Sequence, residues 1–492
     1  MKIAGLDIGT TGCKVTVFDE KGGKLDSAYC DYPSSRASTG HTVDAGKILE
    51  GVFTVLGKIA VTHPDIAGLG VTSFGETFVL TDENGVPLHP AMLYTDPRGC
   101  DQCAALCKAL GSDRIIHITG VKPHEMYSLP KLLWIKENQP EVYARAKHIF
   151  LMEDLVVFAL TGNAQIDYSL ACRTMAFDIG KLAWSDEILA AAGIKKALFS
   201  KTVPTGTSAG HILPAVAEKT GLSPEMQVIS VSHDQISAAV GAGAFSSDVA
   251  VDGAGTVECL TPIFDKLPDL RTMSRGNFAV VPYVVPGKYV CYAFSYTGGA
   301  LISWCIDNIA KAEKAEAAGC SVNALLESRS QSPTGLLVLP HFAGAATPYM
   351  DTGSKGAVVG LTVATTAADI YRGCMEGVVY EMLLNREALG HDGDGITMLY
   401  ATGGGARSEV WMQMKADVLD LPVTALATVD AGTVGSAMLT GIAVGCFRDL
   451  TDAAAHMVEK VKTYYPDPAM HEKYMTVYQR YRGLYHALRP LV

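Results

Sequence analysis

The sequence of 492 residues lacks any apolar run approaching the roughly 20 residues that a membrane-spanning helix needs. Its apolar stretch at residues 280–294 is broken by Pro282 and Pro286. The N-terminus runs directly into a strand-like segment, without the basic and apolar regions of an export signal. The sequence therefore predicts a cytoplasmic protein with no membrane partner.

Basic residues are outnumbered, because 40 Lys and Arg stand against 51 Asp and Glu, for a formal net charge of −11. No basic cluster offsets this charge, so neither a nucleic acid nor an anionic membrane is expected as a partner. Hydrophobic residues make up 48% of the chain and charged residues 18%, which is typical of a globular protein with buried sheets. A chain of this length should form two large domains rather than one.

The twelve cysteines stand in a chain without an export signal, so they are expected to be reduced thiols. Cys100, Cys103 and Cys107 have a spacing that a metal site could use. The same spacing places them on one face of a helix predicted at residues 100–110, and no further ligand residues cluster nearby. Packing in the core is therefore favoured over a metal site.

The sequence also lacks a P-loop (Gly-x-x-x-x-Gly-Lys-Ser/Thr). It has instead, at residues 7–14, the segment Asp-Ile-Gly-Thr-Thr-Gly-Cys-Lys between an apolar run and an alternating one. This pattern predicts a tight turn between two strands, whose N–H groups and hydroxyls could hold phosphate oxygens. Asp7 would repel phosphate, so its natural role is to hold a divalent cation, directly or through water. An ordinary hairpin is the alternative.

A second segment has the same ingredients near the middle of the chain. Residues 252–258, Asp-Gly-Ala-Gly-Thr-Val-Glu, again follow a short strand-like run. Two such hairpins, one in each half, indicate a duplicated architecture in which a nucleotide is held between two lobes. We expect one lobe at residues 1–245 and the other at residues 246–492.

Acidic residues stand at the ends of predicted strands. The strand at residues 66–73 leads to Glu76, and the same sheet continues towards Asp96. The strand at residues 227–231 leads to Asp234, which opens a helix. Open sheets bind ligands at the carboxyl ends of their strands, so these three residues are candidates for a site. Solvated loop carboxylates are the alternative for the first two, and a plain helix N-cap for the third.

Glycines at residues 403–406 separate a predicted strand from a helix, where they would let a ligand approach the backbone. A tight strand-to-helix connection is the alternative. Gly241-Ala242-Gly243 is interpreted as close helix packing rather than as a nucleotide fingerprint. Residues 111–245 are expected to be mostly helical. The helices predicted along the chain are 100–110, 129–138, 150–160, 300–309, 367–389 and 408–419.

Six segments, in sequence order and over nearly the whole length, resemble the FGGY family of carbohydrate kinases. They are residues 7–14, 126–138, 234–235, 252–258, 356–376 and 403–413. In the fifth, Gly373 stands where Ala or Ser is usual. The resemblance implies an α/β, two-lobed actin-like ATPase fold of the ribonuclease H type, with an active-site cleft between duplicated domains. The N-terminal lobe would bind sugar and the C-terminal lobe adenosine.

The resemblance also implies roles for single residues. Asp234 would be the general base that takes the proton from a substrate hydroxyl, and Asp7 would position Mg²⁺. The residues that would contact ATP are Thr10, Thr11, Lys14, Gly255, Thr256, Gly299, Ser303, Gly404 and Ser408. The residues that would bind or adjoin the substrate are Glu76, Asp96, Met126, Asp234 and Gln235. The implied cofactors are ATP and Mg²⁺.

The segment Phe74-Gly75-Glu76-Thr77 bears on the substrate. Xylulokinase-like members of the family carry Gln-Met-His-Gly in this loop. Glu76 with Asp234 and Gln235 is more similar to glycerol kinases, which carry Arg where this chain has Gly75. The leading hypothesis is an ATP-dependent kinase of a small open-chain sugar, with a ketopentose such as xylulose as first candidate. A kinase of a polyol of the glycerol, erythritol or pentitol type is the alternative.

A non-enzymatic use of the same fold, as an actin-like filament or a chaperone ATPase, is a further alternative. The chaperone would need a separate peptide-binding domain, and residues 435–492 are expected to supply only terminal helices. A sugar sensor without kinase activity is disfavoured because Asp7, Thr10 and Asp234 are all present. A homodimer is an expectation that rests on the resemblance alone.

Overall fold

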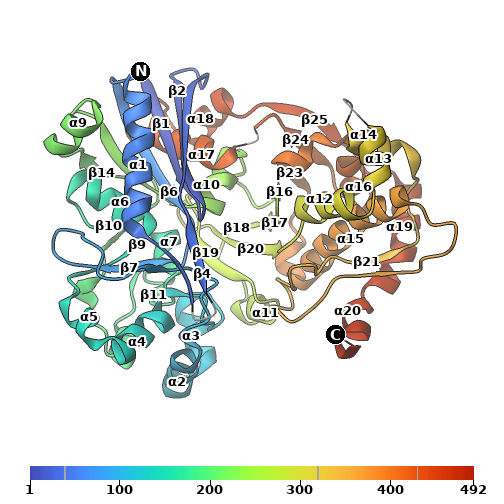
Figure 1. Cartoon of the computed structure of the whole chain (residues 1–492), viewed down its shortest axis with the longest axis horizontal. Helices are drawn as coiled ribbons and strands as arrows, with labels where there is room; N and C mark the ends of the chain where they lie inside the picture. The colour runs from blue at the N-terminus through green and yellow to red at the C-terminus, as the bar shows by residue number, and fades with distance from the viewer. Residues whose placement is uncertain (38–39, 318–320, 429, 492) are drawn as a thin grey trace. The chain divides into compact units, whose positions relative to one another are not determined.

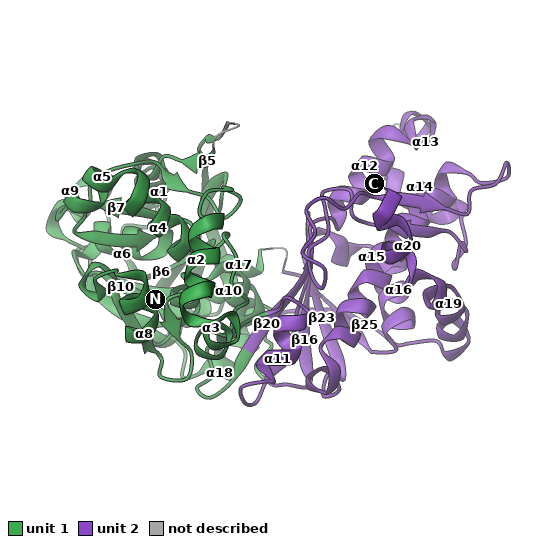
Figure 2. Cartoon of the chain, turned by 90° about the horizontal axis from the view of Figure 1, so that it is seen from below, with its two compact units in different colours: residues 1–245, 279–289, 430–458 green, residues 246–278, 290–429, 459–492 purple. Residues whose placement is uncertain are grey.

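The computed structural model describes residues 1–37, 40–317, 321–428 and 430–491. The chain forms two compact units, which Figure 2 colours green and purple. Unit 1 comprises residues 1–245, 279–289 and 430–458, and unit 2 comprises residues 246–278, 290–429 and 459–492. The chain thus returns to unit 1 twice after first leaving it.

A six-stranded sheet in the order β14-β15-β6-β1-β2-β3 forms the centre of unit 1 (Figure 1). Strands β1, β6 and β15 are parallel to one another, and the other strands pair antiparallel with their neighbours. The strands are β1 (Lys2–Ile8), β2 (Gly12–Asp19), β3 (Lys24–Asp31), β6 (Ile66–Ser73), β14 (Thr207–His211) and β15 (Gln227–His233). The carboxyl ends of these three parallel strands therefore lie side by side, along one edge of the sheet that runs across the strands.

Alternate residues of β1 point to opposite faces of this sheet. Leu6 and Ile8 belong to a buried apolar cluster with helix α1 (Ala45–Ala60), which runs along the sheet in Figure 1. Gly5 lies against helix α17 (Ala431–Ala443) on the other face, where an added Cβ would be 2.1 Å from a backbone oxygen of that helix. Asp7, two residues further along β1, points to the face that α17 covers.

The rest of unit 1 consists of smaller sheets and short helices. A five-stranded sheet has the order β4 (Ser34–Ala37), β5 (Gly40–Val43), β8 (Ala91–Met92), β7 (Phe78–Thr81) and β9 (His148–Leu151). Two-stranded sheets pair β10 (Gln165–Asp167) with β13 (Lys201–Val203) and β11 (Phe177–Asp178) with β12 (Ala183–Trp184), and β19 spans Ala279–Pro282. The further helices are α2 (Cys100–Leu110), α3 (Ser112–Thr119), α4 (Ser128–Asn138), α5 (Pro140–Arg145), α6 (Met152–Thr161), α7 (Tyr168–Cys172), α8 (Asp186–Ala192), η1 (Lys196–Leu198), α9 (Pro214–Thr220), α10 (Asp234–Gly241) and α18 (Leu450–Met457).

Unit 2 repeats the strand pattern of unit 1. Its strands run in the order β18-β20-β17-β16-β23-β24-β25. As in unit 1, three neighbouring strands, β16, β23 and β24, are parallel, and β17, β20 and β25 pair antiparallel with their neighbours. The strands are β16 (Val249–Ala254), β17 (Glu258–Thr261), β18 (Ile263–Phe264), β20 (Tyr289–Ser295), β23 (Met398–Thr402), β24 (Val423–Leu426) and β25 (Lys460–Tyr464), with β21 (Leu337–Leu339) and β22 (Ala357–Val359) in a separate pair. The duplicated architecture that the two hairpins predict is therefore confirmed.

The helices of unit 2 include a long one, α15 (Ala367–Ala388), which agrees with the prediction for residues 367–389 to within one residue. The others are α11 (Leu270–Arg275), α12 (Gly299–Asn308), α13 (Lys311–Glu316), α14 (Val322–Arg329), η2 (Gly390–Gly393), η3 (Gly404–Arg407), α16 (Glu409–Leu419), α19 (Pro468–Tyr481), α20 (Leu484–Leu488) and η4 (Arg489–Leu491). Among the described residues of both units, no helix has the length and apolarity to cross a membrane.

Two local predictions need correction. The helix predicted at residues 150–160 begins only at Met152, because residues 148–151 pair with β7 as strand β9. Residues 111–245 are not mostly helical, since they also contain strands β9 to β15, most of them only two to five residues long. Such short strands carry too few residues for a clear alternation.

Helix α2 spans the predicted residues, but of its three cysteines only Cys103 is fully buried, so packing in the core holds for Cys103 and not for the exposed Cys100.

The interpretation of Gly241 as a packing residue is confirmed. A Cβ at Gly241 of α10 would lie 2.0 Å from the backbone oxygen of Ala431, and one at Gly435 of α17 would lie 1.8 Å from that of Ser237. Only glycine lets the two helix backbones approach so closely. Helix α17 is thereby held against α10, which begins at Asp234.

Candidate active site

Three acidic residues of unit 1 stand at or just beyond the ends of three neighbouring parallel strands. Ile8 of β1 pairs with Ser73 of β6, and Ser73 pairs with His233 of β15. Asp7 is the residue before the end of β1, and Asp234 directly follows β15. The loop after β6 carries Glu76. The sheet register therefore gathers the predicted cation residue, a predicted substrate residue and the predicted base at one edge.

Asp7 lies among other carboxylates. Burial, followed by the charges of Asp234 and Asp430, raises the pKa of Asp7 to about 8, and the positive charge of Lys14 opposes this only in part. A Cβ at Gly432, in the first turn of α17, would lie 2.8 Å from a carboxylate oxygen of Asp7. The start of α17 thus contacts Asp7 closely. A carboxylate in such surroundings favours binding of a cation.

Asp234 is the first residue of α10, and the N-cap position belongs to His233. Burial and the charge of Glu76 raise the pKa of Asp234 to about 7, against a backbone hydrogen bond from Gln235 and the charge of Arg173. The Nε2 atom of His233 lies 3.3 Å from Oδ1 of Asp234, and burial holds the pKa of this imidazole well below its ordinary value. Asp234 is therefore a carboxylate poised to exchange a proton near neutral pH.

Glu76 forms a buried ion pair that the sequence did not reveal. Arg173, which directly follows α7, donates from Nε to Oε1 of Glu76 at 2.7 Å, and its Nη2 contacts the same oxygen. The exposed fractions of Glu76 and Arg173 are 4% and 6%. Ser128 donates from Oγ to the backbone oxygen of Glu76 at 2.7 Å. These contacts hold Glu76 in a left-handed backbone conformation, with φ of 60°.

Gly75 makes room for this ion pair. A Cβ at Gly75 would lie 3.0 Å from Cγ of Arg173 and 3.0 Å from the ring of His233. The glycine before Glu76 therefore does not leave the carboxylate without a cation, because a guanidinium reaches it from a segment almost a hundred residues further along the chain.

Asp96 and Met126, also predicted to lie near the substrate, are engaged by neighbouring cations. Asp96 accepts hydrogen bonds from Nε of Arg98 at 2.8 Å and from Nη2 at 2.6 Å. Burial would raise the pKa of Asp96, but the bonds from Arg98 outweigh it and keep the pKa below its ordinary value. The backbone oxygen of Met126 accepts from Nζ of the buried Lys131 at 2.8 Å. Both residues therefore belong to a tightly bonded part of unit 1.

Thr10, Thr11 and Lys14 form the turn and second strand of the first hairpin. The turn is closed by a hydrogen bond from the backbone N–H of Gly9 to the oxygen of Gly12 at 2.9 Å. Thr11 is exposed, and Thr10 and Lys14 are half-buried. The ammonium group of Lys14 pairs with Asp430, which precedes α17. The hairpin thus carries two hydroxyl side chains that are not fully buried and an ammonium group paired with Asp430, and their contact with ATP stays a prediction.

The predicted ATP residues of unit 2 line one cavity of ≈ 1260 Å³. These six residues are Gly255, Thr256, Gly299, Ser303, Gly404 and Ser408. They come from the second hairpin, from α12, and from the turn that leads into α16. Aromatic walls are provided by Tyr371 and Trp411. The structure thus brings together residues that lie up to 153 positions apart in the sequence.

The second hairpin is fixed to the start of α12. The backbone oxygen of Gly255 accepts from the N–H of Gly299 at 2.8 Å, and that of Thr256 accepts from Gly298 at 3.0 Å and Ala300 at 3.1 Å. At the other end of the cavity, Ser408 caps α16, since its Oγ accepts from the N–H of Trp411 at 3.0 Å. Two loops of unit 2 are thus held rigidly at the cavity wall.

The glycine-rich turn before α16 is a tight strand-to-helix connection that also lines the cavity. A Cβ at Gly403 would lie 2.6 Å from the backbone oxygen of Ala254, and one at Gly405 would lie 2.9 Å from Ala254 and from Trp411. A Cβ at Gly404 would meet open space within the described structure. The first and third glycines are therefore required for packing, and the second one leaves room in the cavity.

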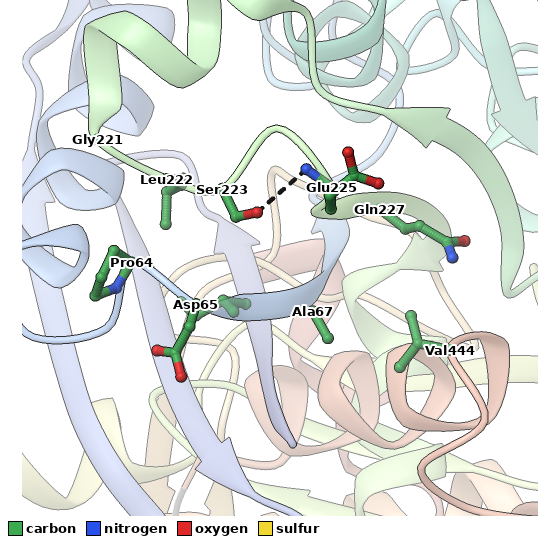
Figure 3. Close-up of a pocket in the computed structure, with 10 residues that line it drawn as sticks. Pro64, Asp65, Ala67, Gly221, Leu222, Ser223, Glu225, Gln227 and Val444 are labelled. Atoms are coloured by element: carbon green, nitrogen blue, oxygen red, sulfur yellow. Dashed lines mark hydrogen bonds between the residues drawn. The ribbon is translucent and has the colours of Figure 1, made fainter.

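A separate cavity of unit 1, shown in Figure 3, lies at the opposite edge of the sheet. It is lined by residues at the beginning of β6 and β15, including Ile66 and Gln227, and by Val444. Because these strands are parallel, their beginnings lie away from Glu76 and Asp234. None of the residues predicted for the site is among those that line this cavity.

The described residues contain no group of three or more His, Cys, Asp and Glu side chains arranged to bind a metal ion directly. Mg²⁺ usually keeps several of its waters and needs only one or two carboxylates. Asp7, whose pKa is raised by burial and then by neighbouring carboxylates, fits this indirect mode of binding.

The duplicated sheets and their hairpins define the two-domain actin-like ATPase fold. The model of the N-terminal domain of the FGGY family of carbohydrate kinases matches residues 2–241, and that of the C-terminal domain matches residues 262–444. The chain belongs to the FGGY family of carbohydrate kinases. It is therefore an ATP-dependent sugar kinase, an enzyme that transfers a phosphoryl group to an alcohol.

Several relatives are similar over almost their whole length. A xylulose kinase of Lactococcus lactis is 28% identical over 98% of this chain and 96% of its own. A gluconokinase of Bacillus subtilis is 27% identical over 96% and 93%, and a glycerol kinase of Delftia acidovorans is 29% identical over 92% of each chain. The crystal structure of a xylulose kinase from Lactobacillus acidophilus superposes with a TM-score of 0.90 at 21% identity, over 99% of this chain and 98% of that one.

Proposed function

We propose that the chain phosphorylates a hydroxyl of a small, neutral, open-chain sugar, with a ketopentose such as xylulose as the first candidate. The observation that carries this proposal is the grouping of Asp7, Glu76 and Asp234 at the ends of three neighbouring parallel strands. Transfer of a phosphoryl group to an alcohol needs a place for a cation, acceptors for the substrate hydroxyls and a base. The three carboxylates supply one of each.

Asp234 is the proposed general base. Its carboxylate takes the proton from the substrate hydroxyl as the oxygen attacks the γ-phosphorus, and the bond to the leaving ADP oxygen breaks. A base works best when its pKa lies near the working pH, and burial raises the pKa of Asp234 to about 7. Since phosphoryl transfer demands little covalent chemistry from the protein, alignment of the hydroxyl is the main remaining task.

Glu76 and Gln235 are proposed to bind the substrate hydroxyls. Two nitrogens of Arg173, Nε and Nη2, contact Oε1 of Glu76, which fixes the carboxylate and leaves Oε2 outside that contact. Gln235 follows the base in the first turn of α10. A substrate without the matching hydroxyls would leave these polar groups unpaired, and that penalty is how such a site rejects the wrong sugar. Asp96 and Met126 are proposed to shape the surroundings of the pocket.

A neutral substrate fits this edge of the sheet better than a sugar acid does. Besides burial, the charge of Asp234 raises the pKa of Asp7 and the charge of Glu76 raises the pKa of Asp234, and the guanidinium of Arg173 is already engaged by Glu76. A substrate carboxylate would therefore meet the like charges of these residues, and the cation beside Glu76 is already paired. We therefore favour a ketose over gluconate, although a gluconokinase is among the relatives.

The nucleotide is proposed to bind in the cavity of unit 2, with adenosine near Gly404 and Ser408 and phosphates near Gly255 and Thr256. Gly299 and Ser303 would lie beside the phosphates. From unit 1, the residues proposed to hold the β- and γ-phosphates are Thr10, Thr11 and Lys14. The proposed division of labour follows the predicted lobes, with sugar bound by residues 1–245 and adenosine by residues 246–492.

Asp7 is proposed to hold Mg²⁺ through water. The ion would neutralise charge on the β- and γ-phosphates. The side chain of Asp7 is kept in place by the start of α17, which lies against it. The negative charge of Asp7 would also repel a polyphosphate that carries no cation, so ATP is expected to bind well only together with Mg²⁺.

A polyol kinase is the second candidate, because one observation favours it. Glycerol kinases carry an arginine directly before the glutamate, and this chain has Gly75 there. Arg173 nevertheless provides a guanidinium at Glu76. The carboxylate and guanidinium that suit a polyol are therefore both present, and a glycerol kinase is among the relatives at 29% identity.

A substrate panel tests the proposal. The full-length chain would be assayed for ADP release with xylulose, ribulose, glycerol, erythritol, xylitol and gluconate at saturating Mg-ATP, with the Asp234→Asn variant as control for contaminating kinases. We expect the highest kcat/KM with a ketopentose, and NMR of the product would identify the phosphorylated hydroxyl. A preference for a polyol would select the second candidate, and a preference for gluconate would contradict the proposed neutral substrate.

A further inference from the structure

A buried lysine of unit 2 has no role in the proposals above. Lys415 lies on α16 with no exposed surface. Its Nζ atom is 2.5 Å from Oδ2 of Asp252 and also contacts Oε1 of Glu258. Asp252 belongs to β16, and Glu258 is the first residue of β17. One ammonium group therefore joins both strands of the second hairpin.

This ion cluster has one positive group for two acids. Burial acts to lower the pKa of Lys415, but the two carboxylates outweigh it and raise the pKa, so the lysine stays charged. Burial and the neighbouring charge of Asp252 raise the pKa of Glu258 well above its ordinary value. Oδ1 of Asp252 and Oε2 of Glu258 accept no hydrogen bond from the described residues. Removing Lys415 would leave these buried acids without their cation.

Lys415 acts from behind the wall of the cavity. It is not among the residues that line the cavity, whereas Gly255, Thr256 and Trp411 are. The Nζ atom lies 4.8 Å from the centre of the Trp411 ring, one helical turn earlier on α16. The loop at residues 255–257 lies between the two carboxylates that Lys415 holds. The lysine therefore controls where the hairpin loop sits without reaching into the cavity.

We propose that Lys415 is a positioning residue for polyphosphate binding, which fixes both strands of the second hairpin so that Gly255 and Thr256 face the phosphates. This inference rests on the proposed role of those two residues. The N-cap residue of the same helix is Ser408, which is proposed to border adenosine. Helix α16 thus joins the two ends of the nucleotide site, one through its N-cap and the other through its buried lysine.

Loss of Lys415 should affect the phosphate end and the adenosine end of the nucleotide site differently. Without Lys415, the hairpin loop should lose its fixed position, whereas Ser408 at the other end of the site keeps its hydrogen bonds with Trp411 and Glu327. Affinity for ATP should therefore fall while affinity for adenosine is retained. A general loss of structure would weaken both ligands alike, so the ratio of the two affinities separates positioning from stability.

The experiment measures the binding of ATP and of adenosine to the full-length chain by isothermal titration calorimetry. The variants are Lys415→Met and, as a matched control, Lys473→Met at an exposed position of the same unit. We expect Lys415→Met to weaken ATP binding about tenfold or more and adenosine binding less than about twofold, with no change in the control. An equal loss for both ligands, or no loss for either, would overturn the inference.

Two further variants keep the test decisive. Glu258→Gln retains the contact between Lys415 and Asp252, so it should fold even if Lys415→Met does not, and it should shift the ratio of affinities in the same direction. Thr256→Ala tests the proposed function itself. If Thr256→Ala leaves the ratio unchanged, the proposed phosphate role of the hairpin fails. If Thr256→Ala changes the ratio and neither Lys415→Met nor Glu258→Gln does, the phosphate role of the hairpin stands and only the inference about Lys415 is wrong.

Discussion

The two hairpins of the chain use their strand carboxylates in opposite ways. In the first, Asp7 lies near Asp234 and Asp430, and its pKa is raised to about 8. In the second, Asp252 is fully buried and held by Lys415. Asp7 therefore lies among like charges that Lys14 offsets only in part, whereas Asp252 has a buried cation beside it. We propose that the first hairpin uses its carboxylate to hold Mg²⁺ and that the second uses its carboxylate as a charge-paired support.

Replacing the proposed base in unit 1 should have the largest effect. Asp234→Asn removes the proton acceptor, so kcat should fall by about 10²–10⁴-fold. Its ATP affinity should change less than about twofold, because the adenosine cavity is formed by unit 2. Steady-state kinetics and calorimetry measure the two quantities, with Asp186→Asn at an exposed position of unit 1 as control. A variant that keeps most of its kcat would remove Asp234 from the proposed mechanism.

Exchanging the carboxylates of the two hairpins for amides tests the comparison directly. Asp7→Asn should lower kcat about 100-fold and raise the Mg²⁺ concentration needed for half-maximal activity, because the proposed cation loses its carboxylate. Asp252→Asn should leave that concentration unchanged, since its partner is Lys415. Activity measured against Mg²⁺ at fixed ATP shows the difference. Equal shifts in both variants would mean that the hairpins are not specialised as proposed.

The ion pair at Glu76 should govern sugar binding. Arg173→Met should raise KM for the sugar about tenfold, since hydrogen bonds to charged groups are worth about 1.5–3 kcal/mol. KM for ATP should stay the same, and Arg173→Lys should recover part of the loss. Initial rates over both substrates give these constants, with Arg114→Met, an exposed arginine of unit 1, as control. A rise in KM for ATP alone would place Arg173 outside the sugar site.

The pH dependence of the rate reports on the base. Because burial raises the pKa of Asp234 to about 7, kcat/KM for the sugar should fall about tenfold per pH unit below that value. The carboxylate must be deprotonated to accept a proton, so the loss is on the acid side. Rates between pH 5.5 and 8.5 at saturating Mg-ATP would show it. A flat profile from pH 6 to 8 would contradict the proposed titration.

The smallest effect concerns stability. The pKa of Asp234 is about 7 in the folded state, above the ordinary value of about 3.9 in unfolded chains. The folded state therefore holds this proton more tightly, and the resulting stabilisation is lost as the pH rises from about 4 to about 7. Asp234→Asn does not titrate, so its Tm should exceed that of the parent chain at pH 8, by about 1–4 °C. At pH 4 the difference should disappear. Thermal melts at both pH values test the sign.

Much of the site was predictable because its residues belong to short local patterns. Both hairpins, the strand leading to Glu76 and the strand leading to Asp234 carry their turn residues and apolar runs next to one another. The six cavity residues of unit 2 were expected from the resemblance of their segments to the FGGY family, and their proximity in space required the fold. Local pattern thus identifies the segments that approach a ligand.

The residues that hold those segments in place were not predictable. Arg173 lies 97 positions from Glu76, and Lys415 lies 163 positions from Asp252. No local sequence motif surrounds Arg173 or Lys415. Each meets its acidic partner only because distant elements of the fold pack together. The strand at residues 148–151 was missed for a related reason, because its apolar side chains continue into those of α6 without a break. Periodicity alone does not separate two such elements.

The placement of α17 has a consequence for how the protein is made. This helix covers the face of β1 at Gly5 and packs against α10, but it is formed by residues 431–443, close to the end of the chain. A nascent chain ending at residue 245 contains the whole central sheet of unit 1 but not the helix that covers one side of it. The unit whose synthesis begins first is therefore completed almost last, and until residues 431–443 have been synthesised its sheet lacks the cover that α17 provides.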